Sequence, residues 1–138
     1  MRILFLDIDG IVHSGESADE PTEYWCWLPV LVELLAPHPD VVVVVHSSWR
    51  YEHTLTELRT VLGELGHRVI DATPRARRWE SIEWWMSQNC RQVSSWRILD
   101  DAPEQFPNPP PPQLIVCDPG RGVSDPAVQA ALRAWLDE

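Results

Sequence analysis

The chain has 138 residues, a length typical of one domain that buries about two thirds of the surface of its unfolded chain. Its apolar content of 44% supports a hydrophobic core, and no run approaches the ~20 apolar residues of a membrane-spanning helix. A net charge of −10 repels phosphates and disfavours non-specific binding to duplex nucleic acid.

The N-terminus and the cysteines favour a cytoplasmic protein. Met1 and Arg2 lead directly into an apolar stretch, without the basic region of a secretion signal. Cys26, Cys90 and Cys117 are odd in number and widely spaced, which fits neither a disulfide framework nor a zinc site. We therefore expect buried free thiols in a reducing compartment, no contact with membranes, and a single domain over residues 1–138.

Strands and helices are predicted to alternate along the chain. In chain order, the expected elements are a strand at 2–6, a helix at 29–36, a strand at 41–46, a helix at 51–65, a strand at 67–70, a helix at 78–89, strands at 96–100 and 113–117, and a helix at 124–138. The run VVVVV at 41–45 is continuous and β-branched, as expected of a strand covered on both faces. Alternation of this kind predicts a doubly wound, Rossmann-like three-layer α/β sandwich with a five-stranded parallel sheet.

Local signals support two of the helices. The helix at 51–65 places leucines at helical intervals and stops at Gly66. The helix at 124–138 opens with Ser124 as the predicted N-cap and carries a proline in its first turn. Among the eight tryptophans, we expect Trp84, Trp85 and Trp135 to pack in the core.

Polar residues follow three of the five predicted strands. Ligands of parallel α/β sheets gather outside the carboxyl ends of the strands, so these residues are the candidates for a site. They are Asp7 and Asp9 after the first strand, Ser47 and Ser48 after the second, and Asp100 and Asp101 at the end of the fourth. Arg75, Arg77 and Arg78 form a cluster that opens the helix at 78–89, whose N-terminus favours anions.

Four carboxylates at one edge would repel one another unless a cation neutralises them. Oxygen ligands select a hard ion, and Mg²⁺ is the expected one. A hydroxyl, an arginine and Mg²⁺ around a carboxylate suit a phosphoryl group. Asp7 is then positioned to attack phosphorus and form an aspartyl-phosphate, while Asp9 protonates the leaving oxygen and later activates water.

Three motifs resemble those of the haloacid dehalogenase superfamily. FLDIDG is similar to its first motif, VVVVVHSSWR to its second and RILDDAPEQF to its acidic fourth motif, in the same order over roughly residues 2 to 118. The chain looks most like small members without a cap domain, including domains of RNA-repair proteins and of proteins of unknown function. The resemblance implies a magnesium-dependent phosphatase that works through a phosphoaspartyl intermediate.

The resemblance also implies roles for individual residues. Asp7 would be the nucleophile and a metal ligand, and Asp9 the acid and base, with its backbone carbonyl on the metal. Ser47, with Ser48 beside it, would hold a phosphate oxygen. Asp101 would be the side-chain metal ligand and Asp100 its support.

The third motif of the superfamily is a lysine or arginine, and this chain contains no lysine. Arg78 matches its position best, with Arg77 and Arg75 as rivals. The second aspartate, Asp9, favours phosphoryl chemistry over cleavage of carbon–halogen bonds. Roughly 30 residues separate Ser47 from Arg78, too few for a cap domain as well as a helix and a strand. An open site of this kind would suit a nucleic-acid end, a phosphoprotein or a small phosphate.

Several alternatives remain open at the level of the sequence. The chain could transfer the phosphoryl group to an acceptor other than water, or bind phosphate groups or a partner with little turnover. A signalling receiver also has five parallel strands and an acidic pocket, but the order of the motifs and the missing lysine disfavour that class. Trp25 and Trp27 are expected to pack rather than to stack on a base, and His13 is a weak candidate for substrate contact. The substrate and the oligomeric state are not predicted.

Overall fold

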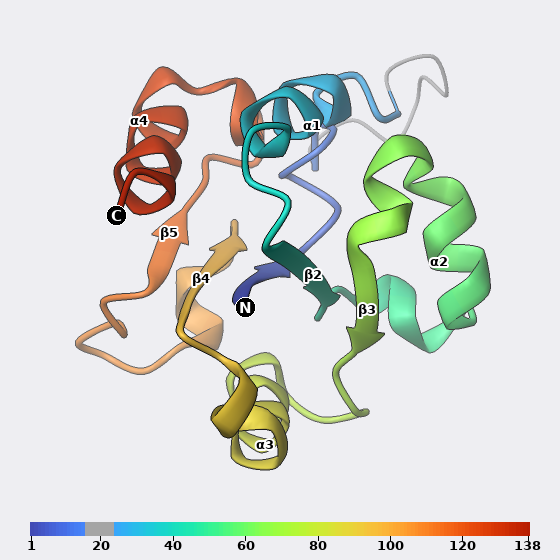
Figure 1. The fold of residues 1–138 in the computed structure, drawn as a ribbon, viewed down its shortest axis with the longest axis vertical. Coiled ribbons are helices and arrows are strands. Elements are labelled where there is room, and N and C mark those ends of the chain that lie inside the picture. Colours follow the sequence, from blue (N-terminus) through green and yellow to red (C-terminus); the bar gives the residue numbers. More distant parts are fainter. Residues whose placement is uncertain (16–23) are drawn as a thin grey trace.

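The computed structural model describes residues 1–15 and 24–138. It contains a five-stranded sheet in the order β3-β2-β1-β4-β5, in which all neighbouring strands are parallel (Figure 1). The strands are β1 (Arg2–Leu6), β2 (Val41–Val45), β3 (Val69–Ala72), β4 (Ser95–Asp100) and β5 (Leu114–Val116). The predicted Rossmann-like α/β fold is confirmed.

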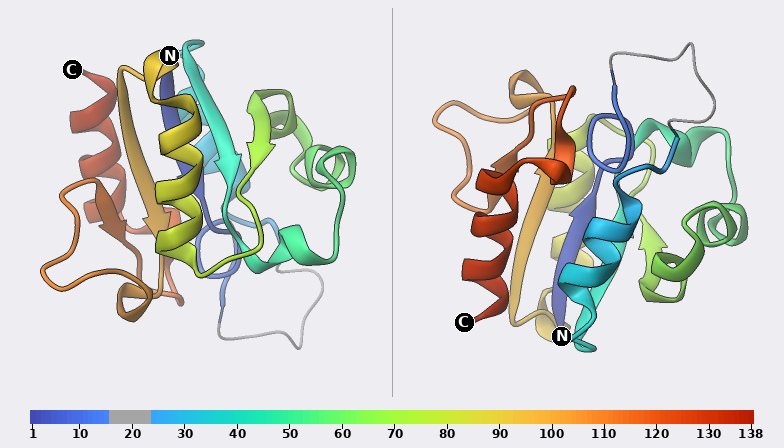
Figure 2. Two further views of the ribbon diagram at one scale, coloured as in Figure 1. Left: turned by 90° about the horizontal axis from the view of Figure 1, so that it is seen from below. Right: turned by 90° about the horizontal axis from the view of Figure 1, so that it is seen from above.

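Helices cover both faces of this sheet. They are α1 (Leu28–Leu35), α2 (Leu55–Val61), α3 (Arg78–Asn89) and α4 (Pro126–Leu136). Figure 2 shows α3 across one face in one view, and α1 and α4 across the opposite face in the other. No cap domain is present among the described residues, and none of their helices is long and apolar enough to cross a membrane.

The two faces of β1 organise two hydrophobic cores, because successive side chains of a strand point in opposite directions. Leu4 and Leu6 belong to the larger core, which includes buried residues of α1, α2 and α4. Ile3 and Phe5 belong to the smaller core, with Ile82 and Trp85 of α3. The central strand is therefore buried on both faces, which holds its carboxyl end firmly in place.

Several boundaries differ from the prediction. The third strand begins at Val69, not at residue 67, because Gly63–Arg68 forms a short 3₁₀ helix, η3. The guanidinium of Arg68 donates to the carbonyls of Leu35, His38 and Val41, which keeps this residue out of the strand.

The second helix also begins later than predicted. Ser48–Tyr51 forms a 3₁₀ helix, η2, and α2 starts only after Thr54. The hydroxyl of Thr54 accepts from the amide of Glu57 while the Glu57 carboxylate accepts from the amide of Thr54, so this capping box fixes the start of α2.

The predicted N-cap Ser124 is wrong. Asp125 caps α4, its carboxylate accepting from the amide of Ala127 at 2.9 Å, while Ser124 ends the short 3₁₀ helix η6 (Gly122–Ser124). Two further 3₁₀ helices, η4 (Cys90–Gln92) and η5 (Pro103–Gln105), flank β4.

Two expectations about burial were also wrong. Trp85 and Trp135 are buried, but Trp84 is 54% exposed, because adjacent residues of α3 point about 100° apart and cannot both face the sheet. Cys117 is buried, whereas Cys26 and Cys90 are exposed.

Candidate active site at the carboxyl ends of the strands

Three carboxylates meet where β1 and β4 end. Asp7 follows β1, Asp100 is the last residue of β4 and Asp101 follows it. These strands are parallel neighbours, so their carboxyl ends lie at the same edge of the sheet. One carboxylate oxygen from each of the three residues lies within 4.8 Å of the others.

Arg78 joins this cluster from the first position of α3. Its Nη1 lies 3.0 Å from Oδ2 of Asp7 and 2.8 Å from Oδ1 of Asp100. The two rival arginines lie elsewhere: Arg77 is an exposed residue at the N-cap of α3, and Arg75 donates to the backbone carbonyl of Tyr51 at 2.8 Å. Of the three arginines, Arg78 is the one that the fold brings to the carboxylates.

Asp100 is saturated with hydrogen-bond donors. Besides Arg78, it accepts from Nε2 of His46 at 2.7 Å and from the amide of Ala102 at 2.8 Å. Burial alone raises the pKa of Asp100, but the hydrogen bond and charge of His46 and the charge of Arg78 outweigh it, so the net pKa lies below its usual value. Asp100 is therefore ionised and tied to the protein, which suits a supporting role.

Asp7 is in the opposite electrostatic situation. Burial, together with the charge of Asp100, raises its pKa to about 7, although His46 and Arg78 act against this. Burial also raises the pKa of Asp101, which lies against Asp7. The positive charge of Arg78 therefore compensates this carboxylate pair only in part.

A divalent cation fits this group of residues. The donors are carboxylate oxygens, which hard ions such as Mg²⁺ prefer, and the raised pKa values of Asp7 and Asp101 mark negative charge that a cation would neutralise. Asp100 is already occupied by Arg78, His46 and Ala102, so Asp7 and Asp101 are the carboxylates of this group that remain to bind the cation.

The turn after β1 brings this carboxylate group together. Gly10 has a φ of +80°, and a Cβ built on it would lie 2.3 Å from Oδ2 of Asp101. Its amide donates to the carbonyl of His13 at 2.9 Å, closing the turn. The glycine is therefore required twice, for its backbone conformation and for the close approach of Asp101.

Asp9 lies beside the carboxylate group rather than in it. One of its carboxylate oxygens is 2.7 Å from Nε2 of His13, and the other accepts from the indole nitrogen of Trp49 at 3.0 Å. The amide of Trp25 donates to Nδ1 of His13, which leaves Nε2 as the nitrogen that donates to Asp9. The hydrogen bond from His13 is the main cause that lowers the pKa of Asp9.

Ser47 occupies the position that the second motif implies, directly after β2, and is buried. Its hydroxyl accepts from the amide of Trp49 at 3.2 Å and caps η2. Ser48 is exposed next to it. Arg50 braces this segment, with its guanidinium bound to the carbonyls of Ser47 and Ala76, and so links the end of β2 to the loop before Arg78.

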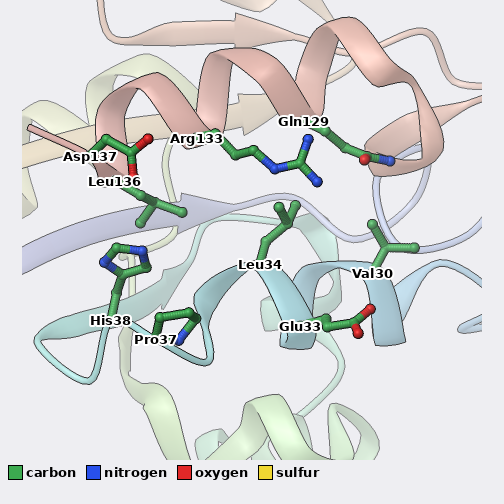
Figure 3. Close-up of a pocket in the computed structure, with 9 residues that line it drawn as sticks. All are labelled: Val30, Glu33, Leu34, Pro37, His38, Gln129, Arg133, Leu136 and Asp137. Carbon is green, nitrogen blue, oxygen red and sulfur yellow. The ribbon is translucent and has the colours of Figure 1, made fainter.

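The described surface is hollowed in several places. A hollow of about 370 Å³ opens at Asp9 and is lined by aromatic side chains. Another, of about 450 Å³, lies between α1 and α4, where side chains of the two helices, among them Leu34 and Arg133, face each other (Figure 3). The hollow at Asp9 borders two of the candidate site residues, Asp9 and Ser48.

Comparison with protein families identifies the fold. Residues 3–128 match the family model described as the HAD domain in Swiss Army Knife RNA repair proteins. The chain belongs to this family. Searches of curated proteins and of solved structures return no significant match. As a haloacid dehalogenase domain the chain falls in a class of phosphatase-type hydrolases, and its aspartate cluster fits metal binding.

Sequence reasoning missed some members of the site. Trp49 and Arg50 stand in the quoted stretch HSSWR, but nothing in the sequence links Trp49 to Asp9 or Arg50 to residue 76. His46, the first residue of that stretch, has a buried ring that holds Asp100. The signal that could have found these three residues is their position directly after β2, which places them near the edge of the sheet where the carboxylates meet.

Proposed function

We propose that the chain is a magnesium-dependent phosphatase that forms a phosphoaspartyl intermediate on Asp7. The observation that carries the proposal is the convergence of Asp7, Asp100, Asp101 and Arg78 at one edge of a parallel sheet. Asp7 is buried at the bottom of this edge, with one oxygen bound by the amide of Ile8 and the other by Arg78, so its orientation is fixed before a substrate arrives.

The reaction needs two displacements at phosphorus. In the first, a carboxylate oxygen of Asp7 bonds to phosphorus while the bond to the leaving oxygen breaks, and that oxygen takes a proton from Asp9. In the second, water attacks phosphorus, gives its proton to Asp9 and releases Asp7 and inorganic phosphate. The lowered pKa of Asp9 favours its ionised form, which accepts the proton of water in the second displacement, whereas the first displacement uses the protonated form.

Asp7 and Asp101 side chains and the backbone carbonyl of Asp9 are the proposed ligands of Mg²⁺. The bound metal would neutralise charge between the nucleophile and the phosphate. Arg78 adds a permanent positive charge and holds Asp100, while Ser47 and Ser48 are the proposed partners of a phosphate oxygen. For Ser47, this role requires that its hydroxyl donate outward while it still accepts from Trp49.

The proposed substrate is the phosphorylated end of an RNA. Two observations support this choice over a phosphoprotein or a small metabolite: the family description names RNA repair, and the described residues carry no cap that would enclose a small molecule. The net charge of −10 disfavours binding along a duplex, but an end requires few phosphate contacts.

Hydrolysis of p-nitrophenyl phosphate, with and without Mg²⁺, tests the chemistry. Wild type is compared with Asp7→Asn and Asp9→Asn, and we expect a metal-dependent rate that Asp7→Asn abolishes. RNA oligonucleotides with a phosphate at the 5′ or the 3′ end then test the substrate class, with a phosphopeptide as the comparison. A metal-dependent rate that persists in Asp7→Asn would contradict the proposal.

The same intermediate could be passed to an acceptor other than water, which would make the chain a phosphotransferase. The two reactions differ in their product. Release of inorganic phosphate in equal amount to the alcohol indicates hydrolysis, whereas a deficit of phosphate indicates transfer. A domain that only binds phosphate would show neither product.

A further inference from the structure

An aromatic pocket lies directly beside Asp9. It has a volume of about 370 Å³, and its lining includes Asp9, Glu52 and the rings of Tyr24, Trp49, Tyr51 and His53. The chain has two tyrosines, and both line this pocket with 38% of their surface exposed. Exposed rings gathered around one hollow are available to a ligand in a way that core rings are not.

The inner wall of the pocket is rigid. The rings of Trp49 and His53 are stacked, with centroids 5.2 Å apart and planes 26° from parallel. Trp25 packs its edge against Trp49 at 5.2 Å, and the indole nitrogen of Trp49 is bound to Asp9. A planar ligand group would therefore meet an aromatic surface formed by Trp49 and His53. The indole nitrogen of Trp49 holds this surface against Asp9, the proposed acid and base.

The charges around the pocket are divided. Asp9 and Glu52 line it, so its interior disfavours a second phosphate. Outside it, the guanidinium groups of Arg50 and Arg75 lie over the ring of Tyr51, at 4.5 and 4.9 Å from its centroid. An uncharged planar group with N–H donors suits the interior, and a phosphate backbone suits the rim.

We infer that this pocket binds the nucleobase of the nucleotide whose phosphate is attacked by Asp7. Stacking on tryptophan, tyrosine and histidine is the general means by which proteins hold single-stranded bases. The carboxylate of Glu52 accepts N–H groups, so it favours a base that presents neighbouring donors, and guanine presents an imino and an amino group side by side. The inference rests on the proposed function in one respect, because it assumes that Asp7 attacks the phosphate of the bound nucleotide. Binding of the base in the pocket does not depend on that reaction.

A phosphotyrosine side chain is the main competitor for such a pocket. Its phenyl ring would also stack, but it has no N–H group to donate to Glu52. The divided charge therefore favours a nucleobase.

Titration with guanosine tests the pocket without any phosphoryl chemistry. We would follow the indole N–H signals by NMR and assign that of Trp49 with Trp49→Phe. Guanosine is expected to shift the Trp49 signal, and ribose is not. Absence of a shift at millimolar guanosine would overturn the inference, even if the protein proves to be a phosphatase.

A matched pair of substrates tests the link to catalysis. Guanosine 5′-monophosphate and ribose 5-phosphate carry the same ester and differ by the base, and we expect kcat/KM to be at least tenfold higher for the nucleotide. Glu52→Gln and Tyr24→Leu should each lower this ratio at least threefold, while Glu83→Gln, an equal change of charge at an exposed position of α3, should leave it as in wild type.

Three results of that comparison would count against the pocket: equal kcat/KM values for the two substrates, a ratio insensitive to Glu52→Gln, or phosphotyrosine preferred over the nucleotide. If neither substrate is hydrolysed, the link between the pocket and catalysis fails, and the guanosine titration still decides whether the pocket binds a base.

Discussion

Nη1 of Arg78 lies 2.8 Å from Oδ1 and 2.9 Å from Oδ2 of Asp100, so one nitrogen at the start of α3 holds both oxygens of a carboxylate at the end of β4. The same nitrogen reaches Asp7 at 3.0 Å. The side chain of Asp100 is fully buried and that of Arg78 is 23% exposed. This pair connects the helix to the sheet and compensates part of the negative charge around Asp7.

Arg78→Ala should therefore lower both stability and activity. It leaves Asp100 buried with less compensation, which we expect to reduce the free energy of unfolding by on the order of 2 kcal/mol. Arg78→Lys restores the charge without the planar geometry and should recover part of both. Urea unfolding and the rate with p-nitrophenyl phosphate check these expectations.

Two controls accompany that variant. Arg91→Ala removes the same charge at an exposed position of η4 and should change stability by less than about 0.5 kcal/mol. Arg77→Ala removes the neighbouring arginine. If Arg77→Ala were as damaging as Arg78→Ala, the assignment of the third-motif position to Arg78 would be wrong.

Gly10→Ala should disrupt the site, because the new Cβ would lie 2.3 Å from Asp101 and the residue has a φ of +80°. Gly63→Ala is a matched control, since Gly63 has a φ of +54° but nothing within 4 Å of the position of a Cβ. The backbone conformation alone costs about 1–2 kcal/mol, which both variants should lose.

The difference between these glycine variants reports the contact with Asp101. We expect Gly10→Ala to be the less stable of the two and to bind Mg²⁺ more weakly, whereas Gly63→Ala should bind it as wild type does. Thermal denaturation with and without Mg²⁺ measures both effects. Equal metal affinity in the two variants would mean that Asp101 is not a ligand.

The raised pKa of Asp7, about 7, predicts a pH dependence of metal binding. A cation must displace the proton of Asp7 below pH 7, so the dissociation constant of Mg²⁺ should fall by up to about tenfold per pH unit as the pH approaches 7, and level off above it. Isothermal titration calorimetry in buffers of different ionisation enthalpy would detect the released proton. A metal affinity that is independent of pH between about 5.5 and 8 would contradict this expectation.

The same group affects the stability of the metal-free protein with a definite sign. An aspartate has an ordinary pKa of 3.8, so between about pH 4 and 7 the native state holds a proton at Asp7 that the unfolded chain has lost. This group therefore makes stability fall as the pH rises through that window. The difference in unfolding free energy between wild type and Asp7→Asn, measured in EDTA, should show this slope.

Trp49→Phe should raise the pKa of Asp9, because it removes the indole N–H that binds the carboxylate and keeps an aromatic ring. In the pH profile of kcat/KM, the limb controlled by Asp9 should move to higher pH. Trp85→Phe is the matched control, since it also removes an indole donor from a carboxylate, that of Asp71 in β3. A shift of equal size in the control would refute a specific effect on Asp9.

The sequence was sufficient to predict the fold and the meeting of Asp7, Asp100 and Asp101, because both depend on strand order and on parallel pairing. Asp9, the fourth carboxylate expected in that group, lies beside it. A buried apolar strand followed by a polar residue places that residue at a known edge of the sheet. Arg78 could be ranked above Arg75 and Arg77 for a similar reason, since it is the first residue of the predicted helix at 78–89.

The environment of Asp9 could not be predicted in this way. The contacts from His13 and Trp49 depend on the turn at Gly10 and on η2, where hydrogen bonds between backbone groups set the direction of each side chain. No periodicity in the sequence encodes these directions. The same applies to the start of α4, where the local path of the backbone makes Asp125 the N-cap in place of the predicted Ser124.

Binding of beryllium trifluoride, followed by fluorine NMR, tests most directly whether Asp7 accepts a phosphoryl group. The compound mimics an acyl phosphate and needs no substrate. With Mg²⁺ present, we predict a bound fluorine signal in wild type that is lost in EDTA and in Asp7→Asn, but retained in Glu83→Gln. A bound signal that persists in Asp7→Asn, or its absence from wild type at saturating Mg²⁺, would contradict a phosphoaspartyl mechanism at Asp7.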